Sequence, residues 1–307
     1  MNIKKMILAA GVLTLIAYFG CSKNPNPTPP VHDTVTVIKT DTLLVPKVVD
    51  TPNLTNGLVL YLPFNGSMAD SSGNGSKVGI LDGATLGYDL HGYPQSAFNS
   101  TGAGTRLVVA NNGAYAVDTA FSLSFDFMIR SNPYYLGGGN YNNLMCFLSI
   151  VDTANGNGPT FAVGMVNPSL PQNFQFSLNS SASNCGSPSN ANLIDNADTT
   201  NFVPQLGSWY NAICTFTNGK VSVYINGQLI STATLAFSSV LFCSSANLVV
   251  GGWWNGGPEN VNGEMDEVRM YNRTLNAAQI AWLSRNFQAS STKTTPGLKS
   301  GSAPSVN

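Results

Sequence analysis

Charged side chains and histidines are scarce in this sequence. Lysine, arginine, aspartate and glutamate make up only 9% of its 307 residues, the net charge is −1, and the two histidines are His32 and His91. Proteins that bind nucleic acid carry clustered basic residues, and no such cluster follows Lys4 and Lys5. The sequence therefore predicts no nucleic-acid partner. Two histidines, one of them in a proline-rich stretch, also argue against a Ser-His-Asp triad.

Cysteine is rare as well, and its five copies divide into one and four. Cys21 ends an apolar leader, whereas Cys146, Cys185, Cys214 and Cys243 lie in the main part of the chain. Four cysteines allow three pairings in an oxidising compartment, and no spacing among them resembles a zinc site. The Ser/Asn-rich or strand-end contexts of Cys185 and Cys243 favour a disulfide between these two. Cys146 and Cys214 are then either buried thiols or paired together.

The apolar leader, residues 6–19, is too short to span a bilayer comfortably. Lys4 and Lys5 precede it and Gly20-Cys21 ends it, which is the pattern of a secretory signal. A cysteine directly after a small residue resembles a bacterial lipoprotein signal, in which Cys21 becomes the lipidated amino terminus. The alternative is an ordinary signal peptide that contains a cysteine. We favour a lipid anchor, which makes the membrane a partner and places the protein at the bacterial outer membrane or cell surface.

Composition divides the rest of the chain. Prolines at 25, 27, 29 and 30 favour an extended spacer, and the Ser/Thr/Lys/Gly/Pro tail is typical of disorder. The expected segments are a signal peptide at 1–21, a Pro/Thr-rich linker at 22–56, a folded domain at 57–288 and a disordered tail at 289–307.

The expected domain is rich in turns and short strands, with 30 glycines in the chain and 43% hydrophobic residues. The stretch 121–130 alternates between apolar and polar residues, which predicts a half-buried strand. Asn218-Gly219 and Asn226-Gly227 suit type I′ hairpin turns. They separate three strand candidates of a meander, at 209–216, 220–225 and 228–235.

The densest group of charges lies in the stretch 263–275, which predicts a closing strand that leads into a final helix. Asn276 can cap a helix over 277–287, and Gln279 stands where it completes a capping box. Many short strands and one terminal helix predict an all-β jelly-roll sandwich.

These pieces together resemble the concanavalin A-like jelly rolls of the laminin G-like family found in bacterial surface proteins. The resemblance covers roughly residues 57–287 and implies a β-sandwich of two antiparallel sheets with a short C-terminal helix. The matching stretches are Leu-Tyr-Leu-Pro-Phe-Asn at 60–65, Asp-Ser-Ser-Gly-Asn-Gly at 70–75, Trp-Tyr-Asn at 209–211, Tyr-Ile-Asn-Gly at 224–227 and the closing stretch 262–275.

The chain departs from the family pattern at three places. Ser76 and Lys77 stand where an Asn-His pair is usual, and Tyr210 and Asn211 follow the meander tryptophan where histidine is usual. Asp126 replaces a tryptophan that is common in the alternating strand. These departures leave the fold expectation intact and argue against transferring family-specific sites.

Catalysis is disfavoured by the closing strand. Glycoside hydrolases on this fold carry a Glu-x-Asp-x-x-Glu strand whose carboxylates share a face. Here Glu264 and Asp266 share a face, but Arg269 stands at the position of the acid, and a guanidinium stays protonated. We expect no enzyme activity, and we expect Glu267 and Arg269 to form a partly exposed ion pair.

A structural calcium ion is the expected cofactor, because calcium takes oxygen ligands and family members often hold one near the sheet edge. The resemblance points to Asp70, Asn74 and Asp266 as ligands. The alternative is an Asx-turn at Asp70 and a hydrogen-bonded Asp266.

Ligand binding requires exposed aromatic rings with amides nearby, and two loops offer them. The alternative for Trp253 or Trp254 is that one of them plugs the end of the sandwich. The candidate ligand-binding residues are Tyr134, Tyr135, Tyr141, Trp253, Trp254 and Asn255.

The sequence thus predicts a non-catalytic, surface-anchored module that binds a polysaccharide or a glycoprotein glycan. One alternative is a protein-interaction or adhesion module without sugar affinity. Another is a glycan-cleaving enzyme on the same fold.

Overall fold

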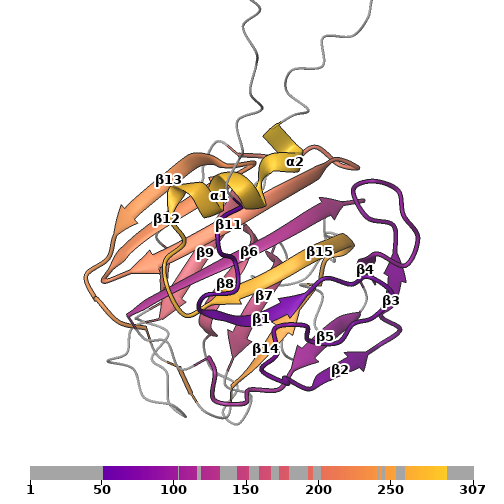
Figure 1. Cartoon of the computed structure of the whole chain (residues 1–307), viewed down its shortest axis with the longest axis horizontal. Helices are drawn as coiled ribbons and strands as arrows, with labels where there is room; N and C mark the ends of the chain where they lie inside the picture. The colour runs from indigo at the N-terminus through magenta and orange to yellow at the C-terminus, as the bar shows by residue number, and fades with distance from the viewer. Residues whose placement is uncertain are drawn as a thin grey trace, which may run out of the picture. The chain divides into compact units, whose positions relative to one another are not determined.

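A computed structural model gives the architecture of the domain. It describes residues 51–102, 104–115, 119–131, 144–151, 159–166, 173–179, 193–195, 202–240, 242–243, 246–253 and 260–288. Two antiparallel sheets stack on each other, and two short helices follow the last strand (Figure 1). The predicted all-β sandwich of two antiparallel sheets is confirmed.

The first sheet has eight strands in the order β13-β12-β11-β6-β15-β4-β3, and β1 pairs with β15 beside this path. Its strands are β1 (Leu58–Leu62), β3 (Thr85–Gly87), β4 (Ala97–Thr101), β6 (Ala120–Ile129), β11 (Trp209–Thr217), β12 (Lys220–Ile225), β13 (Gln228–Thr234) and β15 (Asn262–Tyr271).

The second sheet has seven strands in the order β10-β9-β8-β7-β14-β5-β2. Its strands are β2 (Val78–Leu81), β5 (Arg106–Val109), β7 (Leu144–Val151), β8 (Pro159–Val166), β9 (Asn173–Asn179), β10 (Leu193–Asp195) and β14 (Asn247–Val250).

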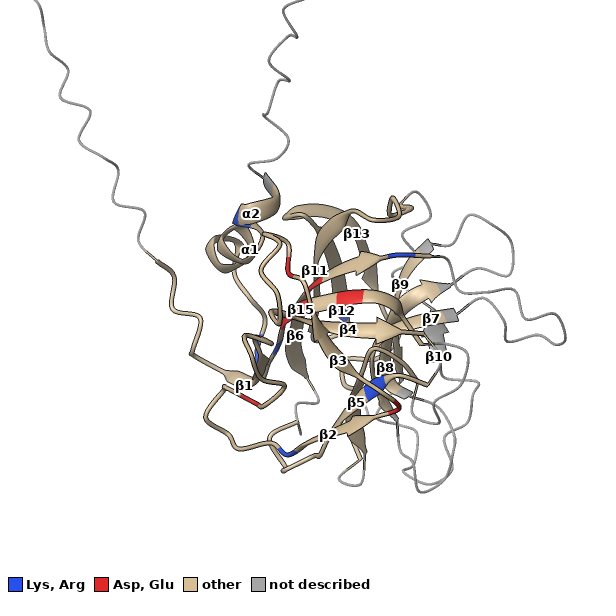
Figure 2. Ribbon diagram, turned by 90° about the vertical axis from the view of Figure 1, so that its right-hand side faces the viewer, with Lys and Arg blue, Asp and Glu red and all other residues tan. Residues whose placement is uncertain are grey.

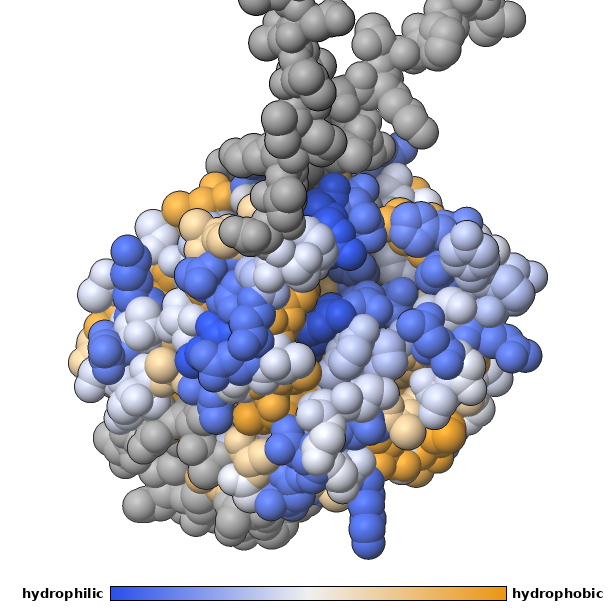
Figure 3. Space-filling view, viewed as in Figure 1, coloured by the Kyte–Doolittle hydropathy of each residue, from blue (hydrophilic) through white to orange (hydrophobic). Residues whose placement is uncertain are grey.

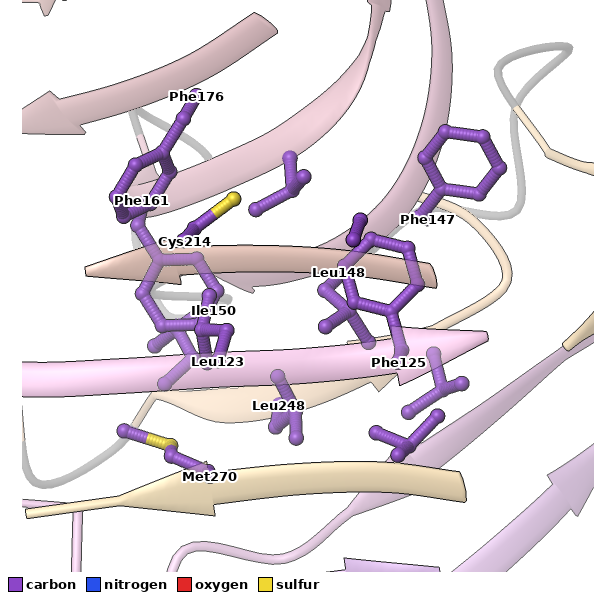
Figure 4. Close-up of a cluster of buried hydrophobic side chains, with 14 of the residues drawn as sticks. Leu123, Phe125, Phe147, Leu148, Ile150, Phe161, Phe176, Cys214, Leu248 and Met270 are labelled. Carbon is purple, nitrogen blue, oxygen red and sulfur yellow. The ribbon is translucent and has the colours of Figure 1, made fainter. Parts of the chain in front are cut away.

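The core fills the space between the sheets with aromatic and aliphatic side chains from both. Because side chains alternate along a strand, the odd-numbered residues of β6 from Phe121 to Ile129 point inward. The rings of Phe125 and Phe127 lie 5.6 and 4.6 Å from that of Phe147 on the opposite sheet. Figure 4 shows Phe125 and Phe147 in this space between the layers. The other face of the first sheet, which we call the outer face, therefore receives the polar residues of β6.

The meander folds as its turn residues predict. Asn218, Gly219, Asn226 and Gly227 all have positive φ, as type I′ turns require. They connect β11, β12 and β13 into consecutive antiparallel pairs.

The closing strand β15 lies inside the first sheet, between β6 and β4. A bulge interrupts its pairing with β6 between Asp266 and Arg269, and Glu267 at the bulge has a φ of 54°. Glu264 and Asp266 share the outer face before the bulge, opposite Met128 and Asp126, as the sequence predicts. The bulge returns Arg269 to the same face.

The expected helix over 277–287 is two helices, α1 (Ala277–Leu283) and α2 (Arg285–Gln288). The single-helix prediction is wrong because the helix is interrupted at Ser284. The N–H and the hydroxyl of Ser284 both donate to the Ile280 carbonyl, at 3.1 and 2.8 Å, and a serine hydroxyl bound in this way tends to bend a helix. The predicted capping box of Asn276 and Gln279 is confirmed.

Helix α1 covers one end of the outer face. Its Ile280 and Leu283 pack against Ile213 of β11 and Tyr271 of β15. The alternation of β6 predicts a half-buried strand, and this prediction is wrong. Ser122, Ser124 and Asp126 on the polar face of β6 are buried too. Covering elements outside the strand decide this burial. None of the described helices is both long and apolar enough to cross a membrane.

Candidate ligand-binding site

Most of the sequence-predicted ligand and disulfide residues fall outside the described part of the chain. This applies to Tyr134, Tyr135, Tyr141, Trp254, Asn255, Cys21 and Cys185. Trp253 is partly buried, and its backbone N–H donates to Asn260 Oδ1 at 3.3 Å. Cys243 is disulfide-bonded, whereas Cys146 and Cys214 are buried thiols. The pairing of Cys243 with Cys185 and the two aromatic loops stay predictions.

The Asp70 loop is tied to strand β1. Asp70 Oδ1 accepts from the backbone N–H of Ser72 at 2.8 Å, which makes an Asx-turn, and from that of Tyr61 at 3.2 Å. Asp70 Oδ2 accepts from the Ser76 N–H and the Ser72 hydroxyl, both at 3.0 Å. Burial acts to raise the pKa of Asp70, but these hydrogen bonds outweigh it and lower the pKa. Asn74 donates to the Leu58 carbonyl at 3.0 Å.

Asp266 has different surroundings from the Asp70 loop, since its neighbours are Glu267 and Asp126. Among the residues that the structure describes, no group of three or more His, Cys, Asp or Glu side chains could hold a metal ion. Calcium binding by Asp70, Asn74 and Asp266 stays a prediction.

The outer face of the first sheet carries a row of three polar side chains on three adjacent strands. Asp126 of β6 stands directly opposite Asn211 of β11 on one side and Asp266 of β15 on the other. Cross-strand partners on one face have Cβ atoms about 4.5–5.5 Å apart, so the three side chains are neighbours. We call Asp126, Asn211 and Asp266 the polar row.

The polar row is buried, and its hydrogen bonds are incomplete. The exposed fractions of Asp126, Asn211 and Asp266 are 8%, 1% and 8%. Asn211 Nδ2 donates to Asp126 Oδ1 at 2.7 Å, and Asp266 Oδ1 accepts from the Glu267 N–H at the bulge, also at 2.7 Å. Asn211 Oδ1 is buried without a hydrogen-bond partner. Since buried polar atoms normally have partners, this oxygen marks the row as a place where a hydrogen-bond partner is missing.

Burial and neighbouring negative charges hold both carboxyl groups closer to their neutral forms. Burial raises the pKa of Asp126 to about 7, against the effect of the Asn211 hydrogen bond. Burial and the charge of Glu267 raise the pKa of Asp266 to about 8, and Asp126 contributes to the increase. Perturbed carboxyl groups of this kind cluster at functional sites.

Charged and aromatic residues surround the row. Arg130 pairs with Glu264, and Arg269 pairs with Glu267 while its guanidinium lies 4.1 Å from the centre of the Tyr61 ring. Red segments gather where β6, β11 and β15 meet in Figure 2. In Figure 3 strongly hydrophilic residues run down a recess in the middle of the face. Charged side chains thus lie on both sides of the polar row along the outer face.

Aromatic side chains lie near the polar row. Trp209 lies two residues before Asn211 on β11, opposite Met128 on the outer face, and is partly exposed. The loop between β3 and β4 carries Tyr88 and Tyr93, each 64% exposed. The same loop carries Asp89, whose charge acts on Asp266.

Sequence reasoning missed the polar row, although it singled out each member for another reason. Asp126 and Asn211 stand out as departures from the family pattern, and Asp266 as part of the closing strand. The missing information was the pairing of β6 with β11 and β15. The alternation within each strand shows which face of the sheet a side chain lies on, but it does not show which strand lies beside it.

Comparison with solved structures finds the same fold at low sequence identity. The receptor-binding domain of botulinum neurotoxin mosaic serotype C/D matches with a TM-score of 0.55 at 15% identity, over 76% of this chain and 51% of the toxin domain. The binding domain of botulinum neurotoxin DC in complex with SialylT gives 0.53 at 20% identity, over 76% and 52%. The chain thus spans about half the length of these toxin domains.

Domain 4 of AbnA, a GH43 extracellular arabinanase from Geobacillus stearothermophilus solved with arabinotriose, gives a TM-score of 0.49 at 19% identity, over 74% of this chain and 98% of that domain. No curated protein sequence matches the chain significantly. A family model does: the model of the concanavalin A-like lectin/glucanases superfamily matches residues 100–281, more than half of the sequence. The chain belongs to the concanavalin A-like lectin/glucanase superfamily.

Proposed function

We propose that this protein is a non-catalytic module that binds a carbohydrate through the outer face of its first sheet. The observation that carries this proposal is the buried polar row beside the partly exposed Trp209. Sugar hydroxyls donate well to carboxylates and amide oxygens, and sugar rings stack on aromatic faces. The polar row supplies the acceptors, and Trp209, Tyr88 and Tyr93 supply the rings.

Structural neighbours support the proposal at the level of the fold. They include a toxin binding domain in complex with SialylT and the same kind of domain in complex with rat synaptotagmin II. A glycan or a glycoprotein is therefore the kind of partner that we expect.

Arg269 supports the non-catalytic part of the proposal. It occupies the position that a glycoside hydrolase of this fold fills with its acid, and it is held by Glu267 and Tyr61. An observation that favours the enzymatic alternative is the raised pKa of Asp126 and Asp266, because a general acid must hold its proton near neutral pH. Release of reducing sugar from a bound polysaccharide, abolished by Asp266→Asn, would establish that alternative.

The adhesion alternative has its own observation. Leu229 and Ile230 on β13, at the edge of the first sheet, are 54% and 37% exposed. An exposed apolar edge strand is a surface to which a protein partner can add.

A glycan array read by labelled protein tests the proposal, with intrinsic tryptophan fluorescence to measure affinity for each glycan that binds. We expect Asn211→Ala to weaken binding at least about tenfold, because a desolvated acceptor is lost. Asp82→Asn is the matched control, since Asp82 is exposed and pairs with Arg106 away from the polar row. Absence of binding across a diverse array would overturn the proposal.

The remaining parts of the proposal concern placement and calcium. We propose that a lipid on Cys21 anchors the module at the bacterial outer membrane or cell surface, and that Tyr134, Tyr135, Tyr141, Trp253, Trp254 and Asn255 extend the ligand contacts. We further propose a structural calcium ion at Asp70, Asn74 and Asp266. A rise in melting temperature with calcium that is lost in Asp70→Ala would support the ion.

A further inference from the structure

The outer face presents hydrogen-bond acceptors that lack donors. Asn211 Nδ2 donates a hydrogen bond to Asp126. Its Oδ1 is buried without a partner and, as an amide oxygen, can only accept a hydrogen bond. Glu264 Oε2 on the same face is likewise buried without a partner, and Glu264 is only 7% exposed. Ionised Asp126 and Asp266 are acceptors too. The complement of such a surface is a group that only donates.

The face also carries negative charge that the protein does not neutralise directly. The ion pairs among the described residues are Arg106–Asp82, Arg130–Glu264 and Arg269–Glu267. Neither Asp126 nor Asp266 belongs to one. Arg285 and Arg269 act on Asp126 from a distance, but Arg285 donates to the Trp282 carbonyl at 2.7 Å and lies 4.4 Å from the centre of its ring. The two cross-strand carboxyl groups are left facing each other.

Two adjacent carboxyl groups in a buried site attract a cation. An ammonium group is such a cation, and its three donors match the carboxyl groups of Asp126 and Asp266 and the Asn211 oxygen. Trp209 nearby offers a ring face that attracts a cation.

We propose that the glycan recognised on this face is an amino sugar with a free, protonated amino group, held by Asp126, Asp266 and Asn211. This inference rests on the carbohydrate binding proposed above and specifies its ligand class. N-acetylation removes both the charge and two of the donors, and it is expected to weaken binding.

Matched pairs of glycans test the inference. The full-length protein is titrated calorimetrically at pH 7 with hexamers of glucosamine and of N-acetylglucosamine, and it is applied to an array that holds glucosamine and galactosamine oligosaccharides with and without N-acetyl groups. We expect the free amine to bind at least about tenfold more tightly, as for a desolvated charge pair.

Substitutions show which residues cause the preference for the free amine. Asp126→Asn combined with Asp266→Asn keeps oxygen acceptors for the Asn211 amide and the Glu267 N–H but removes both charges, so the preference for the amine should disappear. Asp82→Asn should keep it, and a cooperative thermal transition confirms that each variant is folded.

The outcomes separate this inference from the proposed function. Equal or tighter binding of N-acetylated or neutral glycans overturns the amino-sugar inference and leaves carbohydrate binding in place. A preference for the amine that persists in the double variant also overturns it. Binding of no glycan on the array overturns both proposals.

Discussion

At the scale of single residues, Asp126 and Asp266 place two carboxyl groups face to face on neighbouring strands with little solvent around them. Removing an ionised carboxylate from water is unfavourable, and a second one beside it adds repulsion. The protein therefore keeps in its sheet a pair of groups that oppose folding when both are charged. Such local conflicts are expected where a surface is built to bind something.

The pair makes stability depend on pH in a direction opposite to that of most carboxylates. The pKa values of Asp126 and Asp266 are raised from 3.8 to about 7 and about 8, so the folded protein binds these protons more tightly than the unfolded chain does. The stability that the protonated Asp126 and Asp266 side chains contribute is fully present below about pH 4, and it is lost as the pH rises through 7 to 8.

Asp266→Asn should remove this loss. A domain of this size shifts its melting temperature by about 2–4 °C per kcal/mol. We therefore expect the melting temperature of the variant to exceed that of the wild type by several degrees at pH 9. The difference should close toward pH 4. Melting curves from pH 4 to pH 9 measure the gap, with Asp82→Asn as the exposed control. A gap that stays constant across this range would contradict the assigned burial.

Gly263 shows how closely β15 and β6 pack. A Cβ atom on Gly263 would lie 1.9 Å from the Met128 carbonyl oxygen, whereas one on Gly79 of β2 would lie 3.6 Å from its nearest neighbour, the Val108 oxygen. Neither glycine has a positive φ. Gly263→Ala should therefore lower the free energy of unfolding by about 2–4 kcal/mol, and Gly79→Ala by less than about 1 kcal/mol. Urea denaturation measures the free energy of unfolding of both variants. Equal decreases would show that β15 and β6 can move apart at little cost in free energy.

At the scale of elements, one glutamine connects α1 to two segments outside the helix. The Gln279 side chain donates to the Asn53 carbonyl at 2.6 Å and accepts from Arg273 Nη1 at 2.9 Å and from the Asn276 N–H at 3.1 Å. It therefore joins the segment before β1, the end of β15 and the helix start. The cap residue Asn276 serves the helix alone, through Gln279 N–H at 3.0 Å.

Substitution should separate these two roles. Asn276→Ala should lower the free energy of unfolding by about 1 kcal/mol, as loss of a helix cap does. Gln279→Ala should lower it by more, because Gln279 is 4% exposed and its removal breaks three hydrogen bonds, two of them to segments outside the helix. Chemical denaturation gives both values. If the Asn276 variant is the less stable of the two, the glutamine does not connect the elements as described.

The elements that could be predicted from sequence are those with local physical signals. Asn218-Gly219 fixes a hairpin because both residues must adopt positive φ, and Asn276 with Gln279 fixes a helix start within four residues. The strand 121–130 and its inward face follow from alternation alone, and the structure places β6 one residue earlier, at Ala120–Ile129.

The candidate site could not be predicted in the same way, because its residues meet through long-range pairing. Asn211 and Asp126 are 85 residues apart in the sequence, and no local pattern places β11 beside β6. The bulge at Glu267 likewise has no local sequence signal, since it depends on the register between β15 and β6. The burial of Asp126 depends in addition on elements outside its own strand.

At the scale of the whole molecule, the proposed anchor and the proposed binding surface act together. A domain tethered to a membrane surface presents many copies to one polysaccharide, and linked weak contacts reach a high combined affinity without any new interaction. A single site made of the polar row and the nearby aromatic rings is then sufficient for function. The anchor depends on Cys21, because the apolar leader is too short to hold the protein in a bilayer comfortably.

Changing Cys21 tests this arrangement. In cells that express the full chain, the wild type should partition into the detergent phase of a Triton X-114 extract, because attached acyl chains bind the membrane strongly. Cys21→Ser should move the protein to the aqueous phase and release cells from a glycan-coated surface, although the purified variant should bind the same glycans in solution. Cys214→Ala, which alters a buried thiol of β11, is the matched control and should keep the anchor. Retention of the Cys21→Ser protein in the detergent phase would show that the leader, rather than a lipid, holds it there.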